Sequence, residues 1–249
     1  MSLWDPKCVS LALVAVGIAV VSGAGGGPVR MGSRAPTLAA SPAPDRQALA
    51  LRFAPWLYLH PDEPFEILAV IPVLHPHRPL IAYHIFFAED ALLAGHGDPS
   101  DHEIVWVAYD PVTLEVTDVL TLWHRAVLRT DACVAEARAN GGRPRLEVQW
   151  GQHGILPFGW RAAPTRRTRC LLRLHYLFMR YLGGMPWLES RGYHVSFSGS
   201  YADYLRFAEP VDLAPYVGRE EPLVAEWSTA GLESRFHRGF QRKREWPDL

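Results

Sequence analysis

The sequence has few cysteines, almost no net charge, no long apolar run and no nucleophile motif. The formal net charge of −1 provides no global field that would steer the protein to nucleic acid. It contains no Gly-x-Ser-x-Gly motif, which argues against Ser-His-Asp chemistry, and no phosphate-binding P-loop. Cys133 and Cys170 could pair in an oxidising compartment, but neither belongs to a Cys-x-x-Cys motif. Three classes of function remain after these exclusions: a binding module, a metal-dependent enzyme and a structural domain.

The composition is that of one ordinary globular domain. The chain has 249 residues, of which 49 % are apolar and 20 % are charged, so it can bury a sizeable core. Nine Trp, nine Tyr and ten Phe favour a β-rich core or an interfacial surface.

The N-terminal segment resembles a targeting sequence. Lys7 precedes an apolar run over residues 9–21, and small residues follow at 22–24. The run of about 13 residues is short for a membrane-spanning helix, which needs roughly 20. We therefore expect a signal peptide over residues 1–24, or an anchor if this segment is not cleaved. Export to the periplasm or the medium follows. Residues 25–45 are rich in Gly, Pro, Ala and Ser and read as a disordered linker, which leaves residues 46–249 as the folded domain.

Short apolar segments at regular spacing predict a mainly β (α+β) fold, a β-sandwich with peripheral helices. The expected strands lie at residues 56–59, 65–74, 80–87, 103–109, 114–123, 146–150 and 193–197. The expected helices lie at residues 46–53, 131–140, 168–182 and 224–241. The last two helices are rich in arginine, and a basic amphipathic helix can either lie on anionic lipid or pack on the domain with its arginines in solvent.

Residues 90–107 read DALLAGHGDPSDHEIVWV and gather potential metal ligands at a junction between a loop and a strand. Oxygen and imidazole groups at such a junction are what a divalent cation needs. The predicted metal ligands are Asp90, His96, Asp98, Asp101 and Glu103. Because oxygen ligands predominate, we expect Ca²⁺, Mg²⁺ or Mn²⁺. Adding His96 and His124 would open the site to Zn²⁺.

Asp101 and Glu103 are two residues apart at the start of a strand, so their side chains share one face and His102 points to the other. Two like charges on one strand face are unfavourable unless a cation or an arginine lies between them. A metal site, a cluster neutralised by Arg or Lys, and a plain solvated loop are the three interpretations.

Two histidines follow strands and could reach the acidic loop, because loops at one end of a sandwich cluster. These are His124, and His153 in the sequence Gly-Gln-His-Gly. A histidine beside a metal-bound water would act as a general base, which makes both residues candidate catalytic groups. Each could equally cap a turn or satisfy a hydrogen bond in the core.

Three segments together resemble a superfamily that includes the vacuolar-protein-sorting-associated domain family and the necrosis- and ethylene-inducing-like (NLP) cytolysins. Residues 51–65 (LRFAPWLYLHPDEPF) are similar to the pattern APxLxLHxDExY of the first branch. Residues 86–90 and 101–103 resemble the aromatic strand and the Asp-Trp-Glu motif of the cytolysins, and residues 151–154 resemble a Gly-Ser-His-Ala turn. The likeness covers about two-fifths of the chain.

The resemblance implies a cation site in which Asp90, Asp101 and Glu103 match ligands of the cytolysins. His102 stands at the family's Trp, and Asp98 at the position of its ligand His, two residues after His96. The leading hypothesis is therefore an exported protein that binds a divalent cation and recognises a membrane or glycan surface, with no nucleic-acid partner. A metal-dependent hydrolase, whose small-molecule substrate the sequence does not name, and a structural domain without an ion are the alternatives.

Overall fold

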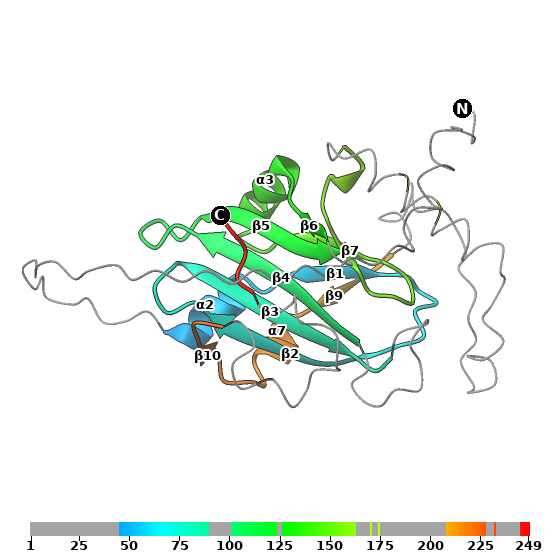
Figure 1. The fold of residues 1–249 in the computed structure, drawn as a ribbon, viewed down its shortest axis with the longest axis horizontal. Coiled ribbons are helices and arrows are strands. Elements are labelled where there is room, and N and C mark those ends of the chain that lie inside the picture. Colours follow the sequence, from blue (N-terminus) through cyan, green and yellow to red (C-terminus); the bar gives the residue numbers. More distant parts are fainter. Residues whose placement is uncertain are drawn as a thin grey trace, which may run out of the picture. The chain divides into compact units, whose positions relative to one another are not determined.

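The computed structural model describes residues 45–89, 101–123, 126–162, 208–227 and 245–249, together with Cys170, Leu174 and Leu232. These residues belong to one compact unit, Asp45–Leu249. Figure 1 shows the described elements as two sheets of strands with short helices beside them.

The described residues form a mainly β, sandwich-like fold of two mixed sheets. The larger sheet has the order β10-β2-β3-β4-β5-β6. Its strands are β10 (Leu223–Val224), β2 (Ile67–Leu74), β3 (Leu80–Phe87), β4 (Asp101–Tyr109), β5 (Val116–Trp123) and β6 (Ala126–Leu128). The smaller sheet has the order β8-β7-β1-β9. It contains β8 (Ile155–Pro157), β7 (Arg145–Val148), β1 (Trp56–Leu59) and β9 (Glu209–Asp212).

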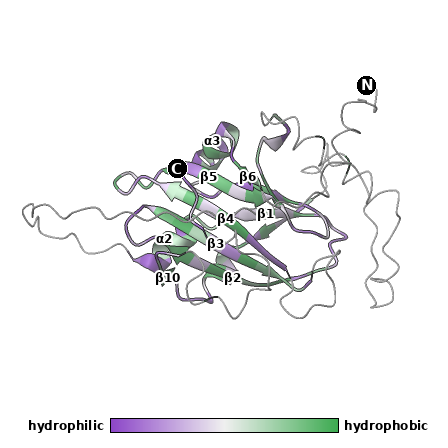
Figure 2. Cartoon of the chain, viewed as in Figure 1, coloured by the Kyte–Doolittle hydropathy of each residue, from purple (hydrophilic) through white to green (hydrophobic). Residues whose placement is uncertain are grey.

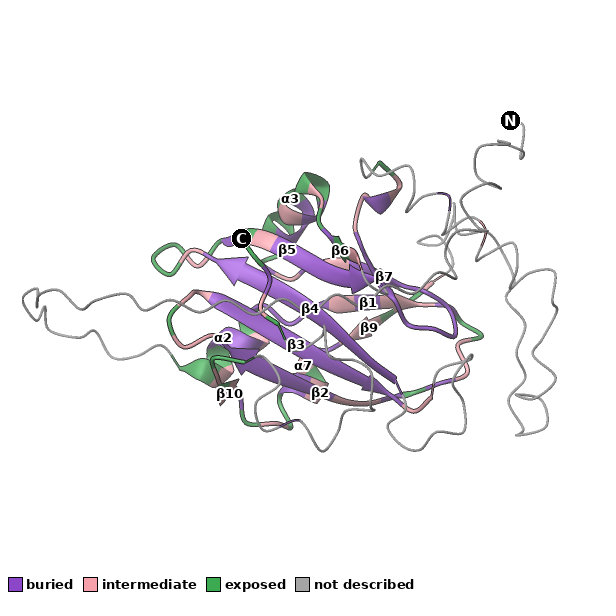
Figure 3. Cartoon of the chain, in the orientation of Figure 1, coloured by how far each residue is buried: buried purple, intermediate pink, exposed green. Residues whose placement is uncertain are grey.

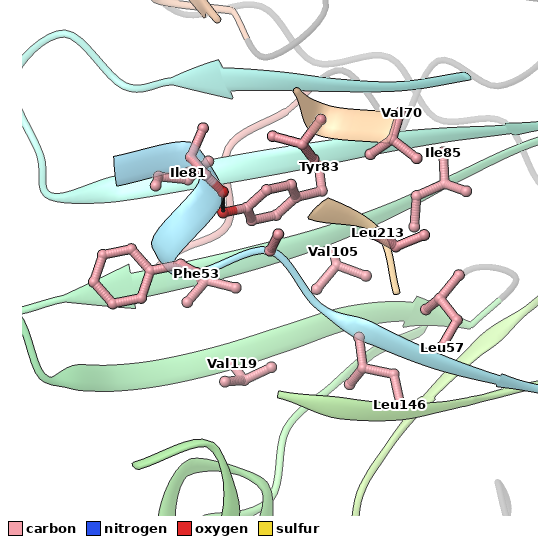
Figure 4. Close-up of a cluster of buried hydrophobic side chains, with 14 of the residues drawn as sticks. Phe53, Leu57, Val70, Ile81, Tyr83, Ile85, Val105, Val119, Leu146 and Leu213 are labelled. Carbon is pink, nitrogen blue, oxygen red and sulfur yellow. Dashed lines mark hydrogen bonds between the residues drawn. The ribbon is translucent and has the colours of Figure 1, made fainter. Parts of the chain in front are cut away.

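The main core lies between the two sheets. Leu57 and Leu146 of the smaller sheet pack in one cluster with Ile85 and Val105 of the larger sheet. Helix α2 (Arg46–Arg52) joins this core, and its Ala50 carbonyl accepts a hydrogen bond of 2.8 Å from the buried Tyr83 hydroxyl (Figure 4). The paired phenol lets a large ring fill the core without leaving an unsatisfied polar group.

The larger sheet is buried on both faces. Alternate residues of β3 and β4 enter the cluster between the sheets, and the residues between them, such as Ala82, Phe86 and Trp106, form a second cluster with Leu232. A strand buried on both faces reads as a continuous apolar run, and β3 (LIAYHIFF) does so.

Most of the predicted elements in the first half of the domain are confirmed. The strand at 56–59 and the strand at 80–87 have the predicted bounds, and helix α3 (Asp131–Ala139) ends one residue early. β4 begins at Asp101, two residues before the predicted start, because Asp101 and His102 continue the ladder with Phe87 and Phe86. The chain also forms β6, β8, β9 and a short helix α7 (Ala214–Val217), which the apolar pattern did not predict.

The structure decides two points from the sequence: the start of the helix predicted over 224–241, of which only residues 224–227 and Leu232 are described, and the pairing of Cys133 with Cys170, which the sequence left open. The helix predicted over 224–241 does not begin at Val224, because Leu223 and Val224 form β10 and pair with Val73 and Leu74 of β2. Cys133 is a buried free thiol, so the pairing of Cys133 with Cys170 does not form. Burial raises the pKa of Cys133 to about 12, and the thiol therefore stays protonated.

Other expected elements cannot be compared. The strand at 193–197 lies outside the described residues, as do residues 1–44 and almost all of the helix expected at 168–182. In the part of the chain that the structure describes, none of the helices has the length and the hydropathy needed to cross a bilayer.

Candidate functional site

A polar cluster is buried where β4 begins. Figure 2 shows this end of β4 as hydrophilic, and Figure 3 shows the same stretch as buried. Asp101, His102 and Glu103 are 2 %, 2 % and 5 % exposed. Because polar groups are buried only when they are satisfied, this end of the strand has a specific set of partners.

His153 is the centre of this cluster. Its Nδ1 lies 2.7 Å from Asp101 Oδ2, and its Nε2 lies 3.1 Å from Glu63 Oε1. The imidazole also stacks on the ring of Phe87, with 3.8 Å between the ring centroids, and is completely buried. His153 therefore joins the start of β4 to the loop that follows β1.

Two further hydrogen bonds, each between a side chain and a backbone group, join the loop after β1 to the loop after β7. Glu63 Oε2 accepts a hydrogen bond of 2.9 Å from the amide of Gly151, and the carbonyl of Asp62 accepts one of 2.9 Å from the indole of Trp150. Because β1 and β7 are parallel neighbours, their carboxyl ends meet at one edge of the smaller sheet. The loops that follow these two strands are therefore side by side.

The 149–154 turn brings His153 into position through an uncommon backbone conformation. His153 has φ of +52°, in the left-handed region that non-glycine residues seldom adopt, and Gly151 has φ of +68°. The His153 amide donates a hydrogen bond to the carbonyl of Gln149, and the Gln149 amide donates one to the carbonyl of Gly154. The contacts of its ring hold His153 in this strained backbone conformation. Strained residues of this kind are typical of functional sites.

Replacing Gly154 with alanine should destabilise the turn. A Cβ at this position would lie 2.7 Å from Trp123 Cδ1 and 2.9 Å from Gln149 Oε1, and these two side chains are hydrogen bonded to each other. We expect a loss of about 1–3 kcal/mol in the free energy of unfolding, measured by urea denaturation. Gly218→Ala is the control, because its closest contact would be 3.3 Å. Equal effects of the two substitutions would contradict a tightly packed turn.

The carboxylates on either side of His153 determine its protonation. Burial opposes the charged imidazole, but the negative charges and hydrogen bonds of Glu63 and Asp101 outweigh burial and raise the pKa of His153 to about 10. At neutral pH, His153 is an imidazolium that donates one N–H to each carboxylate.

Asp101 and Glu103 lie on the same face of β4, as the sequence predicted. They pair in register with Phe87 and Ile85, whose side chains face the core between the sheets. Asp101 is already engaged through both oxygens, because Oδ1 accepts the amide of His102 at 2.8 Å and Oδ2 accepts His153. A carboxylate oxygen has two lone pairs, so a hydrogen bond to it does not by itself exclude a cation.

The described residues alone do not make a complete metal centre. Within the ranges that the structure describes, no three His, Cys, Asp or Glu side chains are arranged to hold an ion. Four predicted site residues lie outside these ranges: Asp90, His96, Asp98 and His124. Their role as ligands or as a base remains a prediction from the sequence.

Comparison with known proteins adds no assignment. No protein-family model matches the chain, and neither the curated proteins nor the solved structures give a match. The resemblance to the vacuolar-sorting and NLP superfamily therefore remains a hypothesis that depends on the three sequence segments.

Glu63 is the site residue that the sequence analysis did not identify. It lies in the segment HPDEPF, two residues before Phe65, whose amide donates a hydrogen bond of 3.3 Å to Glu63 Oε1. The acidic residue of the DExY pattern was a usable signal, since a carboxylate in a Pro-rich turn next to a buried strand needs a partner.

His102 points to the opposite face of β4, as the alternation of side chains predicted. Its Nε2 lies 2.9 Å from Nδ1 of the buried His84, and its ring stacks on Phe86. His102 is therefore separated by the sheet from Asp101 and Glu103, and it belongs to the second cluster of the larger sheet.

Proposed function

We propose that the protein is an exported recognition module that binds a divalent cation through Asp101 and Glu103 at the start of β4. The observation that carries this proposal is the burial of two carboxylates on one face of one strand, two residues apart. Two carboxylates on one strand face can serve together as oxygen ligands of one cation, and this holds although Asp101 already has the His153 imidazolium beside it. Ca²⁺, Mg²⁺ or Mn²⁺ suits ligands that are mainly oxygen.

His153 fixes the orientation of Asp101 by holding Oδ2 at 2.7 Å, while its positive charge works against a second cation at the same carboxylate. A carboxylate that is hydrogen bonded on its outer side keeps one orientation, which lowers the cost of binding an ion. The recognised partner is a membrane or glycan surface, and the ion shapes the loops that meet it.

The geometry does not favour a hydrolase that uses His153. A general base must be unprotonated and must reach the proton it removes. His153 is completely buried, and both its ring nitrogens are bonded to carboxylates. The hydrolase alternative therefore depends on His124, which lies outside the described residues.

The cation can be detected by its effect on thermal stability. An ion that binds only the folded protein adds about 2.7 kcal/mol at 100 times its Kd, which should raise Tm by roughly 5–10 °C for a domain of this size. We expect such a shift with Ca²⁺, Mg²⁺ or Mn²⁺ in the full-length protein after treatment with a chelator. Asp101→Asn and Glu103→Gln should each abolish it.

Glu147→Gln is the matched control for this experiment. Glu147 is also a buried carboxylate on a strand, but its oxygens are bound by the guanidinium of Arg161 at 2.6 and 2.9 Å. This variant should keep the full shift. Absence of a shift in the parent protein would contradict the cation site, and so would a shift retained by both Asp101→Asn and Glu103→Gln. The cluster would then have a purely structural role.

A further inference from the structure

The smaller sheet has a second face, which points away from the core and carries aromatic and charged side chains in register. Trp56 and Tyr58 of β1 alternate with the core residue Leu57 and are half-buried. Trp56 is paired with Arg145 of β7 and with Asp212 of β9. We call the set of Trp56, Tyr58, Arg143, Arg145 and Asp212 the β1 platform.

Arg143 is fixed on three sides. Its guanidinium lies over the ring of Trp56, 4.9 Å from the ring centroid, and pairs with the Asp212 carboxylate. Its Nε donates a hydrogen bond of 2.7 Å to the carbonyl of Ala54. Although burial opposes ionisation, the hydrogen bonds from Arg143 and from the amide of Ala214 lower the pKa of Asp212, so both charges persist at neutral pH.

Arg145 has the same kind of support and remains accessible. It lies over Phe158, 5.6 Å from the ring centroid, and pairs with the buried Glu136. The hydrogen bond to Glu136 raises the pKa of Arg145 further. The side chain is nevertheless 43 % exposed, and that of Asp212 is 31 % exposed, so donors and acceptors of fixed orientation face solvent.

The charges of the platform indicate what it can bind. Arg143 and Arg145 each have a carboxylate of their own, so the platform has no net positive charge with which to attract phosphate or anionic lipid. It offers instead two half-buried aromatic side chains, one of them with Arg143 over its ring, beside planar hydrogen-bonding groups that are already oriented. Neutral polyhydroxyl ligands match this combination, because their C–H faces pack on aromatic rings while their hydroxyls pair with charged groups.

We infer that the β1 platform binds a neutral saccharide, with Tyr58 and Trp56 as the stacking surface and Arg145 and Asp212 as partners for its hydroxyls. This inference depends on the recognition role proposed above and selects glycan over membrane as the partner. β1 connects the platform to the acidic cluster directly, since Glu63 lies four residues after the end of the strand.

Binding can be measured with the full-length protein on an array of neutral oligosaccharides built from glucose, xylose, mannose and N-acetylglucosamine. Sulfated oligosaccharides and phosphatidylglycerol vesicles serve as anionic probes. We expect the protein to bind at least one neutral series, and we expect Trp56→Ala and Tyr58→Leu each to reduce its affinity at least tenfold. Tyr58→Leu replaces the aromatic ring and hydroxyl with an aliphatic side chain. It is the second test, used if Trp56→Ala does not fold. Trp227→Ala is the matched control, because Trp227 is an exposed tryptophan on another part of the surface, and it should bind normally.

Repeating the array in calcium and in chelator separates this inference from the cation proposal. Binding to a neutral glycan that persists in chelator and is lost in Tyr58→Leu supports the platform even if no ion raises Tm. A thermal shift with an ion but no binding to any neutral glycan overturns the platform and leaves the cation site standing. Binding only to the anionic probes, or binding that Trp56→Ala and Tyr58→Leu leave intact, also overturns it.

Discussion

Replacing His153 with alanine should lower the free energy of unfolding by about 3–5 kcal/mol, which is the usual cost of removing one partner from a buried ion network. The substitution leaves Glu63 and Asp101 buried without the imidazolium that lies between them at 3.1 and 2.7 Å. It also removes the stack on Phe87. Urea denaturation followed by circular dichroism measures the loss, and the two loops joined by His153 should become susceptible to proteolysis.

His77→Ala provides the comparison. His77 also pairs with a carboxylate, at 3.1 Å from Glu226, but both side chains are exposed. An exposed pair contributes between zero and about 1 kcal/mol, so this substitution should be close to neutral. A loss below about 1 kcal/mol for His153→Ala would show that the imidazolium does not hold the cluster together.

Continuous apolar runs explain why the strands of the larger sheet were predictable. β3 and β4 are apolar on both faces and bounded by polar or Pro-rich turns, so pattern alone located them within two residues. The pattern also placed Asp101 and Glu103 on one face of β4. β8, β9 and β10 are only two to four residues long, and Glu209–Asp212 contains a proline and two acids, so their pairing depends on tertiary contacts that local pattern does not encode.

The composition of the site was harder to predict than the fold. From the sequence we expected a metal ion, an Arg or Lys, or solvent beside the acidic residues, and we named His153 as a histidine able to reach them. The structure places His153 against Asp101 as an imidazolium. His153 lies 52 residues from Asp101 and 90 from Glu63 in the sequence. The contact with Glu63 depends on the parallel pairing of β1 with β7, and the contact with Asp101 depends on how the two sheets pack, and no local motif specifies either. The charge of His153 depends in turn on those contacts.

The charge of His153 should make the protein less stable as the pH rises above neutrality. The folded pKa of about 10 exceeds the unfolded value of 6.5, so the folded state keeps a proton that the unfolded state has lost. The contribution is fully present below pH 6.5 and disappears as the pH approaches 10. Over this range the free energy of unfolding should fall by about 1.4 kcal/mol per pH unit, or on the order of 5 kcal/mol in total. Urea denaturation at half-unit intervals measures the slope.

Three other buried groups, Cys133, Tyr83 and Tyr109, do not affect the pH dependence between pH 6.5 and 8.5. Cys133 has a folded pKa of about 12 against an ordinary value of 9.0, so its contribution to the pH dependence begins only above that interval. Burial also raises the pKa of Tyr83 and Tyr109 above 10, which places their effect at still higher pH. His153→Ala should therefore flatten the profile between pH 6.5 and 8.5, and Cys133→Ala should leave it unchanged there. A parent protein whose stability is constant across this interval would mean that His153 is neutral in the folded state. Glu63 and Asp101 would then need another cation to balance their charge.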